Sequence, residues 1–164
     1  MGSMESGCAN QTVDRIKRSG PAGIVRRVRG ALVCGLAIAG IVLAARLHPD
    51  PVGAGTHTQL HMPSCSILNR TGWPCPTCGI TTSLSAMARG DIGLALRAQP
   101  FGMVLFLALV ASALMGGVMM LSGRPMLAAF RPRAWWVLVA GAGLLLGWAV
   151  KLSVGVACGE LPIR

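Results

Sequence analysis

The chain has little charge, and very little of that charge is acidic. Of its 164 residues 12% are charged and 53% are hydrophobic, whereas about a quarter of the residues of a typical soluble domain are charged. This shortage excludes an ordinary soluble enzyme and a disordered chain. The excess of 15 Lys and Arg over 5 Asp and Glu would suggest nucleic-acid binding on a polar protein. On an apolar chain it indicates orientation in a membrane, so we expect a protein that contacts a lipid bilayer and binds no nucleic acid.

Carboxylates are too few to support hydrolytic chemistry. Between the first two long apolar runs the only acidic residues are Asp50 and Asp91, and each is better explained as a turn or helix-cap residue. General acid–base catalysis by a pair of carboxylates is therefore not expected. We assign no catalytic residue and favour a role other than that of an enzyme.

Three uncharged stretches are candidates for membrane spans: residues 30–45, 98–123 and 134–150, the last continuing as an apolar run to 158. A span needs about 20 residues, which predicts helices over about 30–47, 99–122 and 134–155. The sequence thus predicts an all-α membrane protein, with a basic cytoplasmic tail at 1–29 and a single three-span domain at 30–164. Arg46 and Lys151 fall near the ends of spans, where their long side chains are expected to reach the headgroups.

Basic residues predict the orientation of these spans. Residues 1–30 and the connection at 124–133 are both rich in arginine, and short basic segments stay in the cytoplasm. An even number of spans separates the two, so the N-terminus is expected in the cytoplasm. Residues 48–97 and the C-terminus then lie outside it. Small residues four apart, at 31 and 35, 113 and 117, and 143 and 147, predict close helix packing within the chain.

A pair of short helices is expected between the loop and the second span. Ile80, Leu84 and Met87 recur at helical spacing. Gly90 can end this helix and Asp91 can cap the next one, which carries Ile92, Leu96 and Arg97. We expect the pair to lie at the membrane interface, and Pro100 to open the second span.

Residues 48–78 contain most of the side chains that could bind a metal or react, including all three histidines and three of the six cysteines. Turn residues are frequent here, so we expect a loop with little regular structure. The sequence C-P-T-C-G at 75–79 has two interpretations. In a redox pair Cys75 would cap a helix and Pro76 would occupy its first position. In a zinc knuckle Cys75 and Cys78 would provide two thiolates, and Cys65, His57 and His61 are candidates for the missing ligands.

The predicted topology also places Cys158 outside the cytoplasm. Cys65, Cys75, Cys78 and Cys158 then form an even set in a compartment where disulfides form. All four are candidates for disulfide or redox chemistry, and the sequence does not choose among their three full pairings.

An ordered series of motifs resembles a known bacterial family. The series is W-P-C-P-T-C-G-I-T-T at 73–82, R-G-D at 89–91 and A-Q-P-F-G at 98–102. Together these are similar to the family called domain of unknown function 2752, over about residues 53–122. The resemblance implies a small protein of the bacterial inner membrane with no assigned activity. Many members carry Arg at the position of Thr82, so a cation expected near the thiols is missing here.

Three hypotheses for function follow. We favour a small structural or partner-binding membrane module whose outward C-P-x-C-G motif is part of a disulfide staple, and whose partner is another membrane protein or a second copy of the chain. The second hypothesis is a zinc site of Cys75 and Cys78 with Cys65 and either His57 or His61. The third is a membrane thiol–disulfide oxidoreductase that exchanges electrons with quinone.

Overall fold

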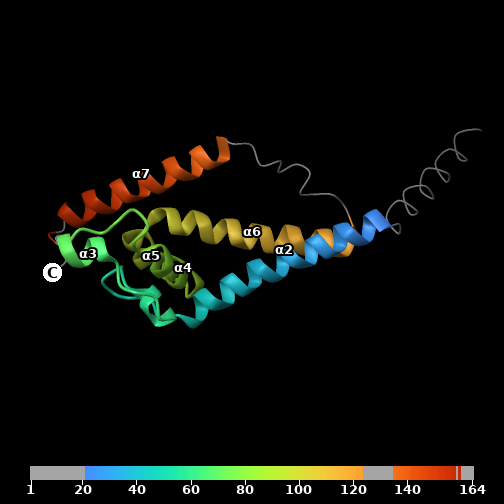
Figure 1. Ribbon diagram of the computed structural model, residues 1–164, viewed down its shortest axis with the longest axis horizontal. Helices are drawn as coiled ribbons and strands as arrows, with labels where there is room; N and C mark the ends of the chain where they lie inside the picture. Colours follow the sequence, from blue (N-terminus) through green and yellow to red (C-terminus); the bar gives the residue numbers. More distant parts are fainter. Residues whose placement is uncertain (1–20, 124–134, 158, 160–164) are drawn as a thin grey trace, which may run out of the picture. The chain divides into compact units, whose positions relative to one another are not determined.

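The computed structural model describes residues 21–123, 135–157 and 159 (Figure 1). These residues form helices and turns and contain no strand. In chain order the elements are α2 (Pro21–Arg46), η1 (Thr56–Leu60), α3 (Ser66–Thr71), α4 (Ile80–Ala88), α5 (Ile92–Ala98), α6 (Pro100–Ser122) and α7 (Trp135–Ala157).

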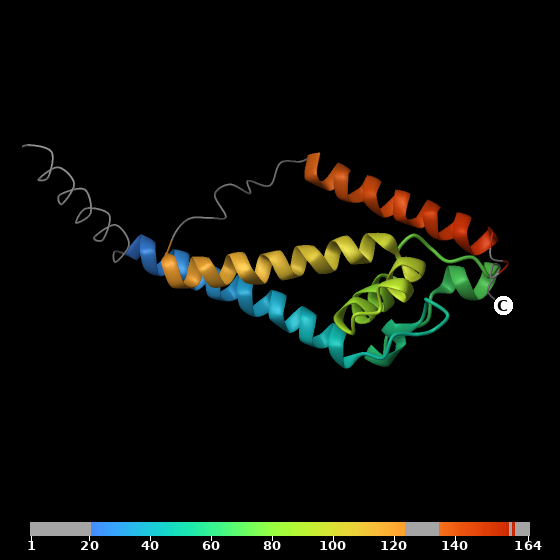
Figure 2. The ribbon, with the colours of Figure 1, turned by 180° about the vertical axis from the view of Figure 1, so that it is seen from behind.

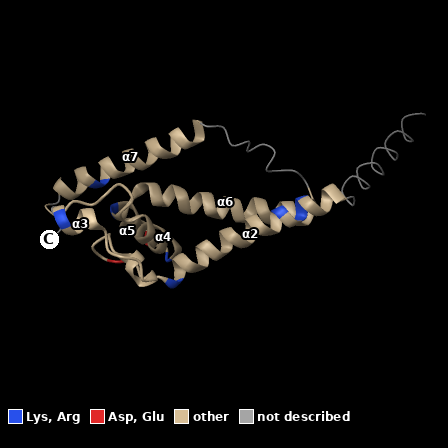
Figure 3. Cartoon of the chain, in the orientation of Figure 1, with Lys and Arg blue, Asp and Glu red and all other residues tan. Residues whose placement is uncertain are grey.

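Three of these helices, α2, α6 and α7, are long and apolar enough to cross a membrane. Large aliphatic side chains cover their surfaces: Leu36, Leu121 and Val137 are 74%, 76% and 74% exposed. Such surfaces are unfavourable in water and suit contact with lipid. α6 carries no charged residue, and Figure 3 shows how little charge the described helices hold. The prediction of an all-α membrane protein with three apolar helices is confirmed.

The first long helix begins nine residues earlier than expected, at Pro21 rather than at residue 30. Proline suits the first helical position because the N–H that it lacks would have no partner there. Arg26, Arg27 and Arg29 then lie within α2. Charge limits how deeply a segment enters a bilayer but does not oppose helix formation, since arginine has a high helix propensity. The uncharged run therefore located the apolar part of this helix and not its start.

The described residues belong to two compact units, and each is treated by itself. The first holds residues 21–38 and 111–123. Within it α2 and α6 pack backbone to backbone: a Cβ added to Gly30 would lie 2.7 Å from Met120 N and 2.8 Å from Gly116 O. The small residues singled out at 31 and 35 and at 113 and 117 are close in sequence to this contact, but the closest approach is at Gly30 and Gly116. Gly35 has no neighbouring atom within 4 Å of its Cβ position.

The second unit holds residues 39–110, 135–157 and 159. Its centre is the pair α4 and α5, which lie side by side in both views (Figures 1 and 2). The buried residues of this pair are small: Thr82, Ser83, Ser85 and Ala86 from α4, with Ala95 and Ala98 from α5. The larger Ile92 and Leu96 are 60% and 52% exposed. Small side chains allow the two short helices to pack closely and leave the bulky ones on the surface.

The predicted ends of these helices are confirmed. Gly90 follows α4 with φ of 80°. Asp91 Oδ1 accepts a hydrogen bond from Leu94 N at 2.9 Å and so caps α5. Pro100 is the first residue of α6. In addition, Gly143 and Gly147 of α7 pack against Phe101, their Cβ positions lying 3.2 Å and 3.1 Å from its atoms, so this small-residue pair packs within the chain.

The segment 48–78 is more regular than the sequence suggested, because η1 and α3 lie within it. Local hydrogen bonds and left-handed residues account for these short helices. Thr58 Oγ1 donates to Gly55 O at 2.8 Å. His61 ends η1 with φ of 58°, and Gly72 ends α3 with φ of 74°. Counting turn residues predicted irregular structure, but here the turn residues mark the ends of two short helices.

Candidate thiol site

Cys75 and Cys78 lie at the two ends of a tight turn. Cys78 N donates to Cys75 O at 3.0 Å. Gly79 follows with φ of 94° and is the N-cap of α4. The redox interpretation expected Cys75 to cap a helix, but the helix begins only at Ile80. The left-handed Gly79 separates the turn from α4, so both sulfurs belong to a turn, as in a knuckle.

A third thiol joins this pair. The sulfur atoms of Cys65, Cys75 and Cys78 all lie within 4.8 Å of one another. Cys65 comes from a separate segment, where it is the N-cap of α3. The Sγ atoms of Cys75 and Cys78 are 3.0 Å apart, and Cys34, Cys65, Cys75 and Cys78 are all free thiols. Three sulfurs from two segments thus converge without a covalent bond between them.

The two cysteines of the turn differ in acidity. Burial by itself raises the pKa of Cys75, but hydrogen bonds from the Cys78 thiol, from Thr77 and from Cys65 outweigh it and lower this pKa to about 7. Burial, together with the neighbouring Cys75 and Cys65 thiols, raises the pKa of Cys78 to about 12. A single negative charge on the pair therefore resides on Cys75, with Cys78 as the hydrogen-bond donor.

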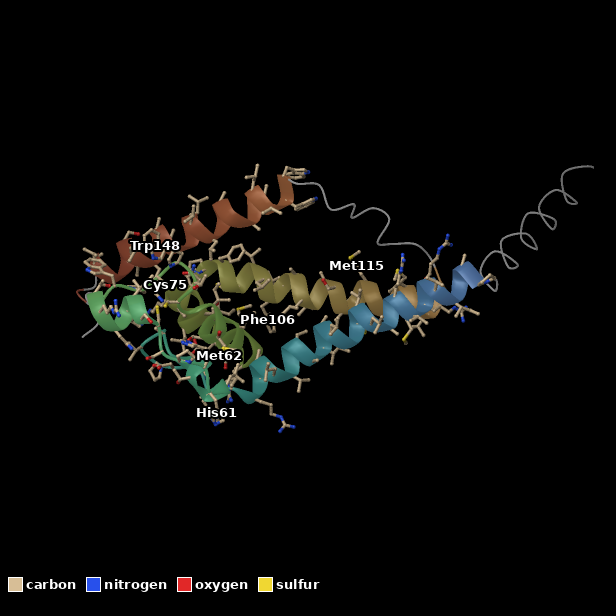
Figure 4. The ribbon with its side chains drawn as sticks, viewed as in Figure 1. His61, Met62, Cys75, Phe106, Met115 and Trp148 are labelled. Carbon is tan, nitrogen blue, oxygen red and sulfur yellow. The ribbon has the colours of Figure 1, made fainter. Side chains whose placement is uncertain are left out.

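Side chains from α7 and from the junction between α5 and α6 hold the turn through its carbonyl groups. Trp148 Nε1 donates to Pro74 O at 2.8 Å, and Gln99 Nε2 donates to Pro76 O at 3.0 Å. Lys151 Nζ donates to Cys78 O at 3.1 Å. Figure 4 shows Trp148 above Cys75, on the side of the turn that α7 covers. These donors satisfy backbone carbonyls of the turn, and a buried carbonyl left without a hydrogen bond is costly.

Lys151 was expected to reach out to the headgroups, and this expectation is wrong. The side chain is only 7% exposed, and its Nζ also donates to Gly53 O at 3.2 Å. The available signal was the presence of a lysine in an apolar run, since intramembrane charges usually mark functional positions. Nothing in the sequence near residue 151 indicated that its partners are the backbone of residues 53 and 78. Trp148 and Gln99 were not identified as site residues either.

The remaining predicted site residues lie elsewhere. Among the described residues, the cluster of potential ligands contains neither His57 nor His61. His57 lies in η1 and His61 ends it. Figure 4 shows His61 well separated from Cys75, near the end of α2. Cys158, predicted as a disulfide or redox partner, lies outside the described residues.

Thr82 has a structural role next to the turn. Its Oγ1 lies 2.8 Å from Thr56 Oγ1, and both residues are 1% exposed. Thr56 Oγ1 in turn accepts a hydrogen bond from Asp50 N at 3.0 Å. This small polar cluster joins α4 to η1 and the loop before it. The expectation that no cation lies near the thiols is also corrected, because Lys151 provides one.

Comparison with known proteins agrees with the motif series. Residues 65–113 match the family described as "Protein of unknown function (DUF2752)". We call these matched residues, 65–113, the DUF2752 segment. The match includes all three clustered cysteines and ends within α6, so the DUF2752 segment excludes Trp148 and Lys151. No curated protein and no solved structure matches the chain.

Proposed function

We propose that the chain is a membrane module with a thiolate metal site, formed by Cys65, Cys75 and Cys78 and suited to zinc. The observation that carries this proposal is the convergence of three free sulfurs within 4.8 Å. A disulfide staple joins two thiols and gives no reason for a third to lie against them. A thiophilic metal ion does give such a reason, because it binds several thiolates at once.

The spacing of the sulfurs supports this choice. Zn–S bonds of about 2.3 Å in a tetrahedral site place the sulfurs about 3.8 Å apart. The observed separations range from 3.0 Å for the turn pair up to 4.8 Å, so shifts of about 1 Å would complete the site. Three protein ligands leave one position for a water or an added ligand, and rearrangement of the loop would be needed to bring in His57 or His61.

A specific observation favours redox chemistry as the second candidate. The Cys75 and Cys78 sulfurs are in close non-bonded contact at 3.0 Å, about 1 Å longer than a disulfide bond, and Cys78 is buried whereas Cys75 is partly exposed. An accessible thiol beside a buried one is the arrangement of a dithiol exchange site. Oxidation would form one S–S bond and pass two electrons and two protons to an acceptor, for which a membrane quinone is the proposed class.

The setting of the module is part of the proposal. Arginines at 26–29 and in the 124–133 connection support a cytoplasmic N-terminus, with the thiol segment outside the cytoplasm in a bacterial inner membrane. A disulfide staple remains the form that the oxidised loop would take. The partner of the module is proposed to be another membrane protein or a second copy.

The test is metal content and free-thiol count on one detergent-purified sample. We expect about one zinc per chain, and loss of most of it in Cys65→Ser, Cys75→Ser and Cys78→Ser. Cys34→Ser is the matched control, because Cys34 lies in α2 outside the cluster. Metal-free protein with a readily reduced Cys75–Cys78 bond would instead support the redox candidate. Metal-free protein with all three thiols reduced would contradict both.

A further inference from the structure

Lys151 lies in a cradle of backbone carbonyls beside the thiol turn. Its Nζ donates to Gly53 O at 3.2 Å and to Cys78 O at 3.1 Å. Gly79 provides the space, since a Cβ there would lie 2.8 Å from Nζ and would also collide with Ala98 O. A lysine ammonium has three donors and no acceptor, so a cradle of carbonyls suits its charged form.

Anchoring alone does not account for a charge at this position. A charged lysine within an apolar helix is unfavourable on membrane-insertion scales. Trp148, one turn earlier on α7, forms an equivalent bond to Pro74 O at 2.8 Å with a neutral donor. Two donors three residues apart on one helix thus hold the same turn, and only one of them is charged. The positive charge needs a negative charge nearby.

The thiols of the turn provide that negative charge. The ammonium of Lys151 donates to the carbonyl of Cys78 itself, so it lies beside the turn that contains two of the three clustered thiols. Three thiolates around a divalent metal ion have one net negative charge, and a single ammonium cancels it. With a monovalent ion the same thiolates would have a net charge of minus two, and Lys151 would cancel only half. A site next to apolar helices favours the neutral combination, because an unbalanced charge is poorly solvated there.

We propose that Lys151 is the charge-balancing cation of the thiolate site and makes the site selective for a divalent thiophilic ion. This inference rests on the proposed metal site and assigns its charge state. Lys151 is then a positioning residue in the third apolar helix, outside the DUF2752 segment. It acts through the field at the thiolates and through its hydrogen bond to the Cys78 carbonyl.

The test measures Co²⁺ binding to the full-length reduced protein in detergent, through the sulfur-to-cobalt charge-transfer absorption. Zn²⁺ competition then gives its affinity. Lys151→Gln keeps a donor and removes the charge, Lys151→Arg keeps the charge, and Trp148→Phe removes a neutral anchor from the same turn. We expect Lys151→Gln to weaken Zn²⁺ binding about 10- to 100-fold, the range typical of residues behind metal ligands. Lys151→Arg should stay within about threefold of the original protein, and Trp148→Phe, which removes an anchor of the same turn, should weaken Zn²⁺ binding less than Lys151→Gln does.

Each outcome has one interpretation. An unchanged Zn²⁺ affinity in Lys151→Gln would overturn the charge-balancing role. A loss of Zn²⁺ affinity in Trp148→Phe as large as that in Lys151→Gln would also overturn it, because anchoring of the turn would then explain both losses. If Lys151→Gln does not fold, as judged by size-exclusion elution, a large loss in folded Lys151→Arg overturns the proposal. Absence of the charge-transfer band in the original protein contradicts the metal site itself, and thereby separates failure of the proposed function from failure of this inference.

Discussion

Cys75 and Cys78 are three residues apart and chemically unequal. The difference arises from the turn, which buries one sulfur more deeply and aims its proton at the other. Thr77 adds a hydroxyl 3.2 Å from the Cys75 sulfur. In the reduced, metal-free protein the accessible thiol is therefore the one that ionises first.

This inequality predicts how alkylation depends on pH. The pKa of Cys75 is lowered from 9.0 to about 7, so its thiolate is present above pH 7 and is lost as the pH falls through 7. We expect the rate of iodoacetamide modification of Cys75 to rise with pH, reach half its maximum near pH 7 and then level off. Mass spectrometry of metal-free, reduced protein provides the rates. Thr77→Val should move the midpoint upward, whereas a midpoint near 9 in the original protein would contradict the hydrogen-bonded pair.

Gly79 is the residue on which the cradle depends most directly. Its φ of 94° and its crowded Cβ position both oppose any other side chain. Gly90 offers a matched control, because its φ of 80° carries the same backbone strain but nothing lies within 4 Å of its Cβ position. We expect Gly90→Ala to lower the free energy of unfolding by about 1–2 kcal/mol. Gly79→Ala should lower it by a further 1–3 kcal/mol or so, from the collision.

Denaturant unfolding in detergent measures both free energies. Equal losses in the two variants would mean that the carbonyls and Lys151 move aside at little cost. The original protein and the two variants should be compared with the metal removed, since bound metal adds its own stabilisation to the folded state.

Sequence reasoning could single out the candidate site residues that a short motif contains, and the fold brings their sulfurs together, while their role stays a prediction. Cys75 and Cys78 stand in one turn, and Cys65 was their nearest cysteine neighbour. Lys151 could not be predicted, because its position is set by how α7 packs beside the turn. A lone lysine near the end of an apolar run has the same pattern whether it reaches the headgroups or turns inward.

At the scale of elements, helix ends were more predictable than helix contacts. Gly90, Asp91 and Pro100 act locally through backbone geometry, and all three predictions about them are confirmed. The sequence pointed to small residues at 31, 35, 113 and 117 without saying which helices meet. Several small residues satisfy a spacing of four, and only the packed helices show that Gly30 and Gly116 are the pair in contact.

This contact predicts a contrast between two glycines of α2. Gly30→Ala places a methyl group within 2.7 Å of Met120 N and 2.8 Å of Gly116 O, which should lower the free energy of unfolding by about 1–3 kcal/mol. Gly35→Ala meets nothing within 4 Å and should be neutral or stabilising by up to about 1 kcal/mol, as alanine is the better helix former. Unfolding in mixed micelles measures both. Equal changes in the free energy of unfolding for Gly30→Ala and Gly35→Ala would mean that the contact lies elsewhere on α2.

At the scale of the whole molecule, the fold class was predictable and the orientation remains a prediction. Composition and the length of apolar runs are properties of entire segments, and three apolar helices agree with them. Orientation depends on where Lys and Arg fall relative to the bilayer, which the fold does not test. The bacterial setting is likewise a proposal that follows from the resemblance.

Two reporters can test the orientation. Alkaline phosphatase fused after Arg164 should be active, because this enzyme folds only outside the cytoplasm, whereas a fluorescent protein at the same point should be dim. A membrane-impermeant maleimide should label Cys75 in intact cells after reduction and metal chelation, and should not label Cys34 within α2. Activity of the fluorescent protein, or labelling of Cys75 only after lysis, would mean that the number of spans differs by one.

Trp148 and Lys151 have a consequence for the order of biogenesis. The chain emerges from the ribosome with the thiol turn first, and the two donors that satisfy Pro74 O and Cys78 O follow about seventy residues later in synthesis. Until α7 has entered the membrane, those carbonyls lack these partners and the three sulfurs are held only by local turns. The site is therefore completed last, and a translation arrest before the third long helix would leave reactive thiols without their final support.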